Sequence, residues 1–234
     1  MRVFTFSCDP YYHILRMFVH QFLAHWDDKQ EVVIVGFSPL PFTIPPNFSF
    51  VSVGEFKDYP VNRWSDAVIK YLESVNDEVF VLMLEDYLLV RDVNIDAVRI
   101  LADYMSAHED IIRIDLAEDR LHASGTDMNY GYIKYIDLIK SAPGSPYHMS
   151  LWPGLWRRSN ILKILQKGWT PWDVEIAGNN KLSAMPELLV LGTKQGPVRI
   201  TLAARGGDPG KIDITALSYE DQKSLISEKR WKPA

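Results

Sequence analysis

The amino-acid sequence predicts an α/β fold with a mixed, mostly parallel central sheet flanked by helices. Short apolar segments without period-two alternation recur along the chain, which is the pattern of strands buried on both faces. Segments with apolar residues at helical spacing lie between them. Alternation of this kind is typical of parallel sheets whose crossover connections are helices.

The first half of the chain shows this alternation most clearly. Strands are predicted at residues 2–7, 31–37, 48–53, 79–84 and 111–116. Helices are predicted at residues 11–26, 63–75 and 94–107. Asp9, followed by Pro10 at the first helical position, is expected to cap the first of these helices.

The periodicity fades after residue 116. Residues 117–146 are predicted to be irregular apart from a strand-like piece at residues 132–136, and long irregular passages in compact domains are often functional. Ser159 or Asn160 is expected to cap a helix that extends to Gln166. Further helices are predicted from Pro171 and over residues 218–229, and strands at residues 188–191 and 198–202.

The length and composition fit one globular domain. A chain of 234 residues can bury a substantial core, and 47% hydrophobic with 24% charged residues is close to the globular average. The net charge of −5 argues against binding nucleic acid by bulk electrostatics, although it leaves room for a local basic patch.

The cysteine content and the hydropathy predict a soluble, cytoplasmic protein. The single cysteine, Cys8, excludes a disulfide within the chain and fits a reducing compartment. The first residues are already strand-like, and Asp9 and Pro10 interrupt any apolar leader. No apolar run reaches the roughly 18 residues that a membrane span needs.

Two adjacent acids, Glu85 and Asp86, end the apolar run in VFVLMLEDYLLVRDV (residues 79–93). Open α/β sheets bind ligands in the crevice at the carboxyl ends of their strands, which is where these acids are predicted to lie. Adjacent acids repel each other unless a positive group lies beside them. A hard cation such as Mg²⁺ or Mn²⁺, held by carboxylate and phosphate oxygens, would serve. The alternative is a polar turn or a helix cap.

Three motifs together resemble those of glycosyltransferases of the GT-A fold, most closely the small bacterial and phage-type members. They are ED at residues 85–86, RWSD at residues 63–66 and PWDVE at residues 171–175. The resemblance implies one Rossmann-like domain over residues 1–234. Residues 1–116 would bind a nucleotide-sugar donor, and residues 117–234 would form the acceptor side.

The resemblance also implies the residues that hold the donor. Asp86, with Glu85, would hold Mg²⁺ or Mn²⁺ on the donor diphosphate, although the usual Asp-x-Asp motif of the family is replaced here by Glu-Asp-Tyr. Ser7 and Asp9 would contact the nucleobase or ribose, and Asp66 would lie near them. Asp9 as a helix cap is an equally good interpretation.

Several basic residues are candidates for contact with the diphosphate. Metal-independent relatives neutralise the leaving group with Arg or Lys, and Arg63, Arg91 and Arg120 could do so here. A C-terminal loop often closes over the diphosphate in this family, which implies the same role for Arg205 and Lys211, although a plain surface turn fits them equally well. His148 is a less favoured third metal ligand, and Cys8 is interpreted as a buried spectator.

The PWDVE motif supplies the candidate general base. An inverting glycosyltransferase needs a carboxylate that deprotonates the acceptor hydroxyl, and Glu175 is the first candidate, with Asp173 second. Two residues apart on a helix, they point in different directions, so one base is expected. The alternative is that both acids only stabilise the helix dipole. The tryptophans at positions 152, 156, 169 and 172 could place an aromatic face beneath a sugar, although most are expected in the core.

The predicted reaction is transfer of a hexosyl or pentosyl group from a nucleotide-sugar to a hydroxyl acceptor. The acceptor is a glycan or a hydroxymethylated base in phage DNA. DNA would require base flipping and a basic face, for which Arg157, Arg158, Lys163 and Lys167 are candidates. The alternatives are a nucleotidyltransferase, which usually has a glycine- and arginine-rich loop where this chain has SCDPYY, and a non-catalytic nucleotide-sugar-binding module.

Overall fold

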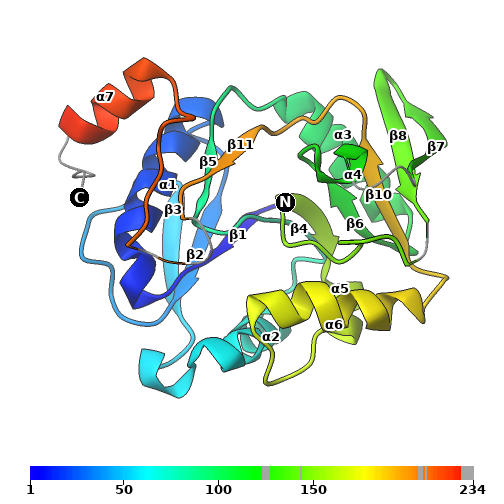
Figure 1. Cartoon of the computed structure of the whole chain (residues 1–234), viewed down its shortest axis with the longest axis horizontal. Helices are drawn as coiled ribbons and strands as arrows, with labels where there is room; N and C mark the ends of the chain where they lie inside the picture. The colour runs from blue at the N-terminus through cyan, green and yellow to red at the C-terminus, as the bar shows by residue number, and fades with distance from the viewer. Residues whose placement is uncertain (123–126, 143, 205–207, 209, 228–234) are drawn as a thin grey trace.

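A nine-stranded sheet forms the centre of the protein, and a two-stranded sheet lies beside it (Figure 1). The structure, a computed structural model, describes residues 1–122, 127–142, 144–204, 208 and 210–227. The strands of the large sheet are β1 (Val3–Phe6), β2 (Val32–Gly36), β3 (Phe48–Ser52), β4 (Val79–Leu82), β6 (Ile111–Asp115), β7 (Asp127–Ile133), β8 (Ile136–Ser141), β9 (Gly154–Arg157) and β10 (Leu189–Thr193). The small sheet pairs β5 (Tyr87–Leu89) with β11 (Ile200–Leu202).

The strand order in the large sheet is β3-β2-β1-β4-β9-β6-β10-β8-β7. β8 and β9 run opposite to the other strands. The predicted α/β class, with a mixed and mostly parallel sheet, is therefore confirmed. The order reverses between β1 and β4, and such a switch point leaves a crevice at the carboxyl ends of the two strands.

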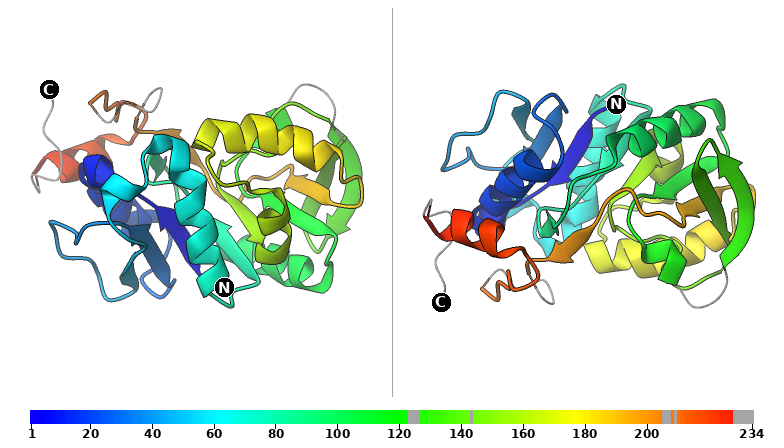
Figure 2. Two further views of the ribbon diagram at one scale, coloured as in Figure 1. Left: turned by 90° about the horizontal axis from the view of Figure 1, so that it is seen from below. Right: turned by 90° about the horizontal axis from the view of Figure 1, so that it is seen from above.

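Helices cover both faces of the sheet, as Figure 2 shows from opposite sides. One face packs against α1 (Tyr12–His25), α3 (Ile95–Ala107) and α7 (Tyr219–Ser227). The other packs against α2 (Trp64–Ser74), α5 (Arg158–Ile164) and α6 (Pro171–Ser183). The remaining helical segments are short: α4 (Asp119–His122), η1 (Asp9–Tyr11), η2 (Phe56–Asp58) and η3 (Val61–Arg63). None of the described helices is both long enough and apolar enough to span a bilayer.

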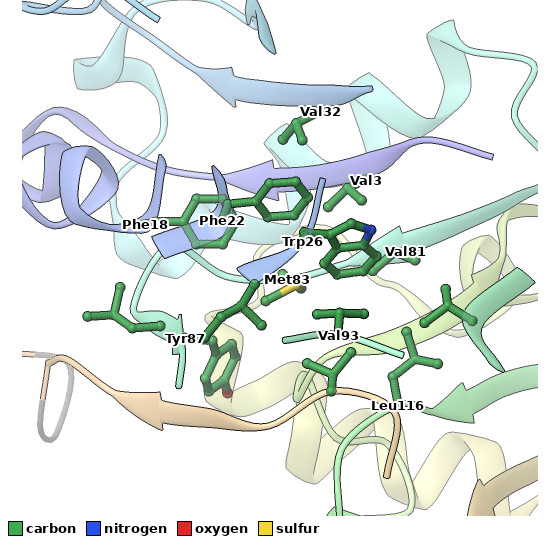
Figure 3. Packing of buried hydrophobic residues seen from close by; sticks show 14 of the residues in the cluster. Val3, Phe18, Phe22, Trp26, Val32, Val81, Met83, Tyr87, Val93 and Leu116 are labelled. Carbon is green, nitrogen blue, oxygen red and sulfur yellow. The ribbon is translucent and has the colours of Figure 1, made fainter. Parts of the chain in front are cut away.

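The two helical layers explain why the strands lack period-two alternation. Successive side chains of a strand point to opposite faces, and here both faces are buried. In β2, Val32 and Ile34 pack in the α1 layer, whereas Val33 and Val35 pack in the α2 layer. Figure 3 shows the α1 side, where Val32 lies with other strand residues beside the aromatic rings of α1.

Two predicted helix caps were wrong. Asp9 does not cap α1, because its carboxylate accepts hydrogen bonds from the backbone N–H and hydroxyl of Ser38, at 3.2 and 2.5 Å. Ser159 and Asn160 do not cap α5, whose N-cap is Arg157. Their side chains instead donate hydrogen bonds to the Glu78 carboxylate and to backbone carbonyls before and within β6.

The passage after β6 is also more ordered than predicted. It contains α4 and the antiparallel hairpin of β7 and β8, so the expectation of an irregular segment was wrong. The strand-like residues 132–136 in fact span the hairpin turn, where Lys134 adopts a φ of 53°. β9 was not predicted, although it lies between β4 and β6 and all four of its residues are buried.

Candidate active site

A cavity of about 540 Å³ lies at the switch point between β1 and β4. Its walls come from the loop after β1, the turn after β4, the first turns of α6 and the end of β11. The predicted site residues that line it are Ser7, Glu85, Asp86 and Glu175. The structure therefore brings together acids that are 90 residues apart in the sequence.

Glu85 and Asp86 occupy the turn that joins β4 to β5. The backbone N–H of Tyr87 donates to the carbonyl of Leu84 at 3.2 Å and closes this turn. The carbonyl of Asp86 accepts a hydrogen bond from Ala203, at 2.7 Å, which ties the turn to the segment after β11. Both acids are thus fixed by backbone contacts at the end of a buried central strand.

Burial shifts the protonation of this acidic pair. Only 7% of Glu85 is exposed, and burial together with the neighbouring charge of Asp86 raises the pKa of Glu85 to about 8. Burial and the charge of Glu175 raise the pKa of Asp86 to about 6. Charged carboxylates are disfavoured where water is excluded and another anion is close. The cavity therefore favours either a proton or a cation at this pair.

Glu175 reaches the cavity from the second turn of α6. Its Oε1 accepts a hydrogen bond from the backbone N–H of Leu151 at 2.8 Å. Burial raises the pKa of Glu175, while the Leu151 bond and the charges of Arg113 and Arg120 act in the opposite direction. A carboxylate that is held in place and has a raised pKa is suited to accept a proton near neutral pH.

The two arginines near Glu175 belong to a buried ion-pair network, formed by Arg113, Asp115, Asp119 and Arg120. Arg113 pairs with Asp115 at 3.2 Å and with Asp119 at 3.6 Å. Arg120 pairs with Asp119 at 3.1 Å. Sequence reasoning missed this network, because a basic and an acidic residue in β6 gave no sign that both are fully buried.

The half of the cavity near β2 and β3 is aromatic. Its rings belong to Phe6, Phe37, Phe56, Tyr59 and Trp64. The ring centroid of Phe37 lies 5.6 Å from that of Phe56 and 5.4 Å from that of Tyr59. This group was not predicted, because its members lie on separate strands, loops and helix ends. Such a surface suits a planar or apolar ring.

The described lining of this cavity contains neither lysine nor arginine. Arg63 pairs with Asp66 at 3.0 Å, and Arg91 donates to the carbonyl of Gly196 at 2.9 Å. Arg120 belongs to the buried ion-pair network. None of the three lines the cavity, so the structure does not bring them to the acidic pair.

Asp9, Asp66 and Asp173 also lie outside the lining. Asp66 accepts hydrogen bonds from Arg63 and from the backbone N–H of Gly168, and these bonds outweigh burial and lower its pKa. Asp173 forms a capping box with Thr170, and its bonds to Thr170 lower its pKa. Each of the three carboxylates thus stabilises local structure at the rim of the site.

Of the remaining candidates that the structure describes, only Cys8 lines the cavity. Arg205 lies outside the described residues. Lys211 is exposed and pairs with Asp208 at 3.3 Å. His148 is 3% exposed, and burial lowers its pKa to about 4. Cys8 lines the cavity, and burial beside Glu85 raises the pKa of its thiol to about 12, so the thiol stays protonated.

The carboxylate oxygens of Glu85 and Asp86 are ligands that fit a hard divalent cation. Mg²⁺ is commonly held by one or two carboxylates together with substrate phosphates, with the rest of its shell made of water. Among the described residues, no three His, Cys, Asp or Glu side chains form a metal-binding group. A cation at Asp86 and Glu85 would therefore depend on oxygens of the substrate.

The four basic residues considered for DNA binding lie away from the cavity. Arg157 ends β9 opposite the first residue of β4, at the edge of the sheet far from the carboxyl ends, and it donates to carbonyls of Met105 and His108. Arg158 pairs with Glu78 at 3.4 Å. Lys163 donates to Asn160, and neither it nor Lys167 lines the cavity.

Comparison with known proteins finds similarity of fold only. The sequence matches no family model and no curated protein. UDP-glucose pyrophosphorylase complexed with UDP-glucose is similar with a TM-score of 0.46 and 9% identity, over 97% of this chain and 99% of that chain. CMP:2-keto-3-deoxy-manno-octonic acid synthetase complexed with CTP has a TM-score of 0.45 and 12% identity, over 97% and 98%. S. aureus TarS 1–349 has a TM-score of 0.45 and 14% identity, and the match covers 85% of this chain but only 59% of TarS 1–349.

Asp173 is predicted to act on stability and not on ligand binding. Thr170→Ala removes the cap of α6 and should cost about 1 kcal/mol of unfolding free energy. Asp173→Ala should also destabilise the protein and lower its thermal midpoint, because it removes the other half of the capping box. Thermal unfolding with and without ligand measures both effects. A normal midpoint combined with lost ligand binding in Asp173→Ala would contradict this assignment.

The acidic pair should make the cation-free protein less stable as pH rises. The folded pKa of Glu85, about 8, lies above its unfolded value, so its contribution is fully present near pH 4 and is lost as pH rises through about 8. In EDTA at pH 8.5, Glu85→Gln should therefore unfold about 3 °C or more above wild type, with a smaller difference at pH 5. Glu73→Gln, on the exposed side of α2, is the matched control. A difference in thermal midpoint between Glu85→Gln and wild type that is the same at pH 5 and pH 8.5 would disprove the assignment.

Proposed function

We propose that the protein is a glycosyltransferase that moves a sugar from a nucleotide-sugar donor to a hydroxyl acceptor. The observation that carries this proposal is the meeting of Glu85, Asp86 and Glu175 in one cavity whose other half is aromatic. A nucleotide-sugar combines a planar base, an anionic diphosphate and a hydroxyl-bearing ring. The cavity offers a stacking surface, oxygen ligands for a cation and a carboxylate base.

The donor is proposed to lie across the carboxyl ends of β1 and β4. The aromatic half would take the nucleobase, and Ser7, at the end of β1, would lie beside the ribose. Asp86 and Glu85 would hold Mg²⁺ or Mn²⁺. The ion would neutralise charge on the leaving group, which is worth several kcal/mol.

Glu175 is the proposed general base. The acceptor oxygen forms a bond to the anomeric carbon while the bond from that carbon to the diphosphate oxygen breaks. The diphosphate leaves with the electron pair, and Glu175 takes the proton of the hydroxyl. Attack from the side opposite the leaving group inverts the anomeric configuration, so an inverted product is expected.

A glycan is the favoured acceptor over hydroxymethylated DNA. A DNA backbone needs free cationic side chains near the reacting base. Arg157 and Arg158, two of the basic candidates, lie at the opposite edge of the sheet from the cavity. A cytoplasmic setting is part of the proposal, since the single cysteine fits a reducing compartment.

The proposal predicts separate effects for the cation site and the base. A nucleotide-sugar should raise the thermal midpoint of the wild type only with Mn²⁺, because a ligand that binds the native state stabilises it. Asp86→Asn should lose this shift. Glu175→Gln should keep it and lower kcat/KM for sugar transfer more than tenfold, which is about 1.4 kcal/mol. The measurements are thermal unfolding with a panel of nucleotide-sugars and transfer to simple glycosides.

Glu187→Gln is the control for these variants, because Glu187 is exposed and lies outside the cavity. Normal turnover by Glu175→Gln would reject its role as base. Formation of a nucleotide-sugar and pyrophosphate from a nucleoside triphosphate and a sugar phosphate would identify a nucleotidyltransferase instead. Donor binding without any turnover by the wild type would identify a binding module.

A further inference from the structure

A second cavity, of about 470 Å³, lies beside the first. Two chain segments line both cavities in succession. Leu151 lines the first cavity and Trp152 the second, and in β11 Leu202 lines the first and Ile200 the second. Tyr87 pairs with Leu202, and its ring centroid lies 6.1 Å from that of Trp152. The two cavities therefore meet along Tyr87 and Trp152.

Glu175 lies close to this boundary. Its carboxylate bonds to the backbone N–H of Leu151, the residue that precedes Trp152. Asp119, which lines the second cavity, also acts electrostatically on both Glu175 and Tyr87. A ligand in the second cavity would thus lie beside the segment that holds the proposed base.

The carboxylates of the second cavity already have cationic partners. The Glu118 carboxylate pairs with Arg199 at 2.8 Å and lies 3.6 Å from the ring nitrogen of His122. Asp119 pairs with Arg120 at 3.1 Å within the buried ion-pair network. The described lining therefore offers little net charge to an ionic ligand. Each carboxylate has roughly four lone-pair sites, so sites remain that can accept hydrogen bonds from hydroxyl groups.

An aromatic residue at the mouth of this cavity has a strained backbone. Tyr147 has a φ of 52°, in the left-handed region that L-residues other than glycine rarely adopt, and its side chain is 63% exposed. Strain of this kind clusters at ligand sites, because a position selected only for stability would favour glycine or asparagine. Trp152, which is partly buried, gives the same cavity a second aromatic ring.

We propose that the second cavity binds the ring of an uncharged carbohydrate. Tyr147 and Trp152 would contact the apolar face of the sugar, and Glu118 and Asp119 would accept hydrogen bonds from its hydroxyl groups. The identification of this sugar as the acceptor rests on the proposed function. A polyanionic acceptor such as DNA would lack free cationic partners here.

The test uses the full chain and the methyl glycosides of glucose, galactose and N-acetylglucosamine. Saturation-transfer NMR should detect binding of at least one of them to the wild type. Tyr147→Gly should weaken this binding about tenfold or more. Its thermal midpoint should stay equal or rise, because glycine adopts a φ of 52° without strain. A purely structural role for Tyr147 would lower the midpoint instead.

Tyr132→Ala is the matched control, since Tyr132 is 77% exposed and lines neither cavity. It should leave binding unchanged. Absence of binding by every glycoside, or equal binding by Tyr147→Gly and wild type, would overturn the proposal. Glycoside binding that is lost in Trp172→Ala but kept in Tyr147→Gly would also overturn it, because Trp172 lines the first cavity. Tighter binding of a hydroxymethylcytosine oligonucleotide than of any glycoside would also overturn it.

The failure of this inference can be told from the failure of the proposed function. The same samples are tested for the Mn²⁺-dependent shift with nucleotide-sugars, which Tyr147→Gly should retain. Glycoside binding that depends on Tyr147, without any nucleotide-sugar shift, would support the second cavity and reject the proposed function. A nucleotide-sugar shift without such glycoside binding would support the function and reject the second cavity.

Discussion

The burial of two adjacent carboxylates at the end of β4 is the constraint on which the site depends. Glu85 and Asp86 cannot both be ionised at low cost in this cavity, because water is largely excluded and Glu175 adds a third negative charge. They cannot move apart easily either, since they are neighbours in a turn that is fixed by the hydrogen bonds of Tyr87 to Leu84 and of Ala203 to Asp86. The cavity is therefore complete only when a proton or a cation joins the pair.

This constraint gives the neighbouring elements their roles in the proposed reaction. The aromatic half of the cavity is formed by residues around β1, β2 and α2, where a planar base can be held without charge. The first turns of α6 bring Glu175 to the other side of the acidic pair. Tyr87 and Trp152 lie where this cavity meets the second one. The sheet thus places three chemically different surfaces along one edge.

The sequence predicted the parts of the fold that have a clear period. The strands and helices of the first half were found because most of the strands are buried on both faces and each helix has one apolar stripe, whereas β3, at the edge of the sheet, is largely exposed. β9 was missed because Pro153 and Gly154 form a dipeptide typical of turns, and only the fold shows that this segment fills the gap between β4 and β6. The β7 and β8 hairpin was missed because its turn, at Lys134, has no glycine.

The acidic pair could be placed from sequence, since an apolar run that ends in acids marks the carboxyl end of a buried strand. Glu175 and Asp173 could not be told apart by spacing alone. The structure separates them, because Asp173 bonds to Thr170 at the helix cap while Glu175, two residues further along α6, lines the cavity. The aromatic group was not predictable, because it assembles from segments that are distant in the chain. The buried ion-pair network is local, but nothing in the sequence indicates that its charged residues are buried.

The most direct test of the central claim is the coupling between Mn²⁺ and a nucleoside diphosphate, measured by calorimetry. Two carboxylates alone make a weak site, so a proposed cation that bridges them to the diphosphate must bind cooperatively with it. We expect Mn²⁺ to tighten binding of one of UDP, GDP, ADP or CDP about tenfold or more, and Asp86→Asn to abolish this coupling. Equal affinity for every diphosphate with and without Mn²⁺ would contradict the account.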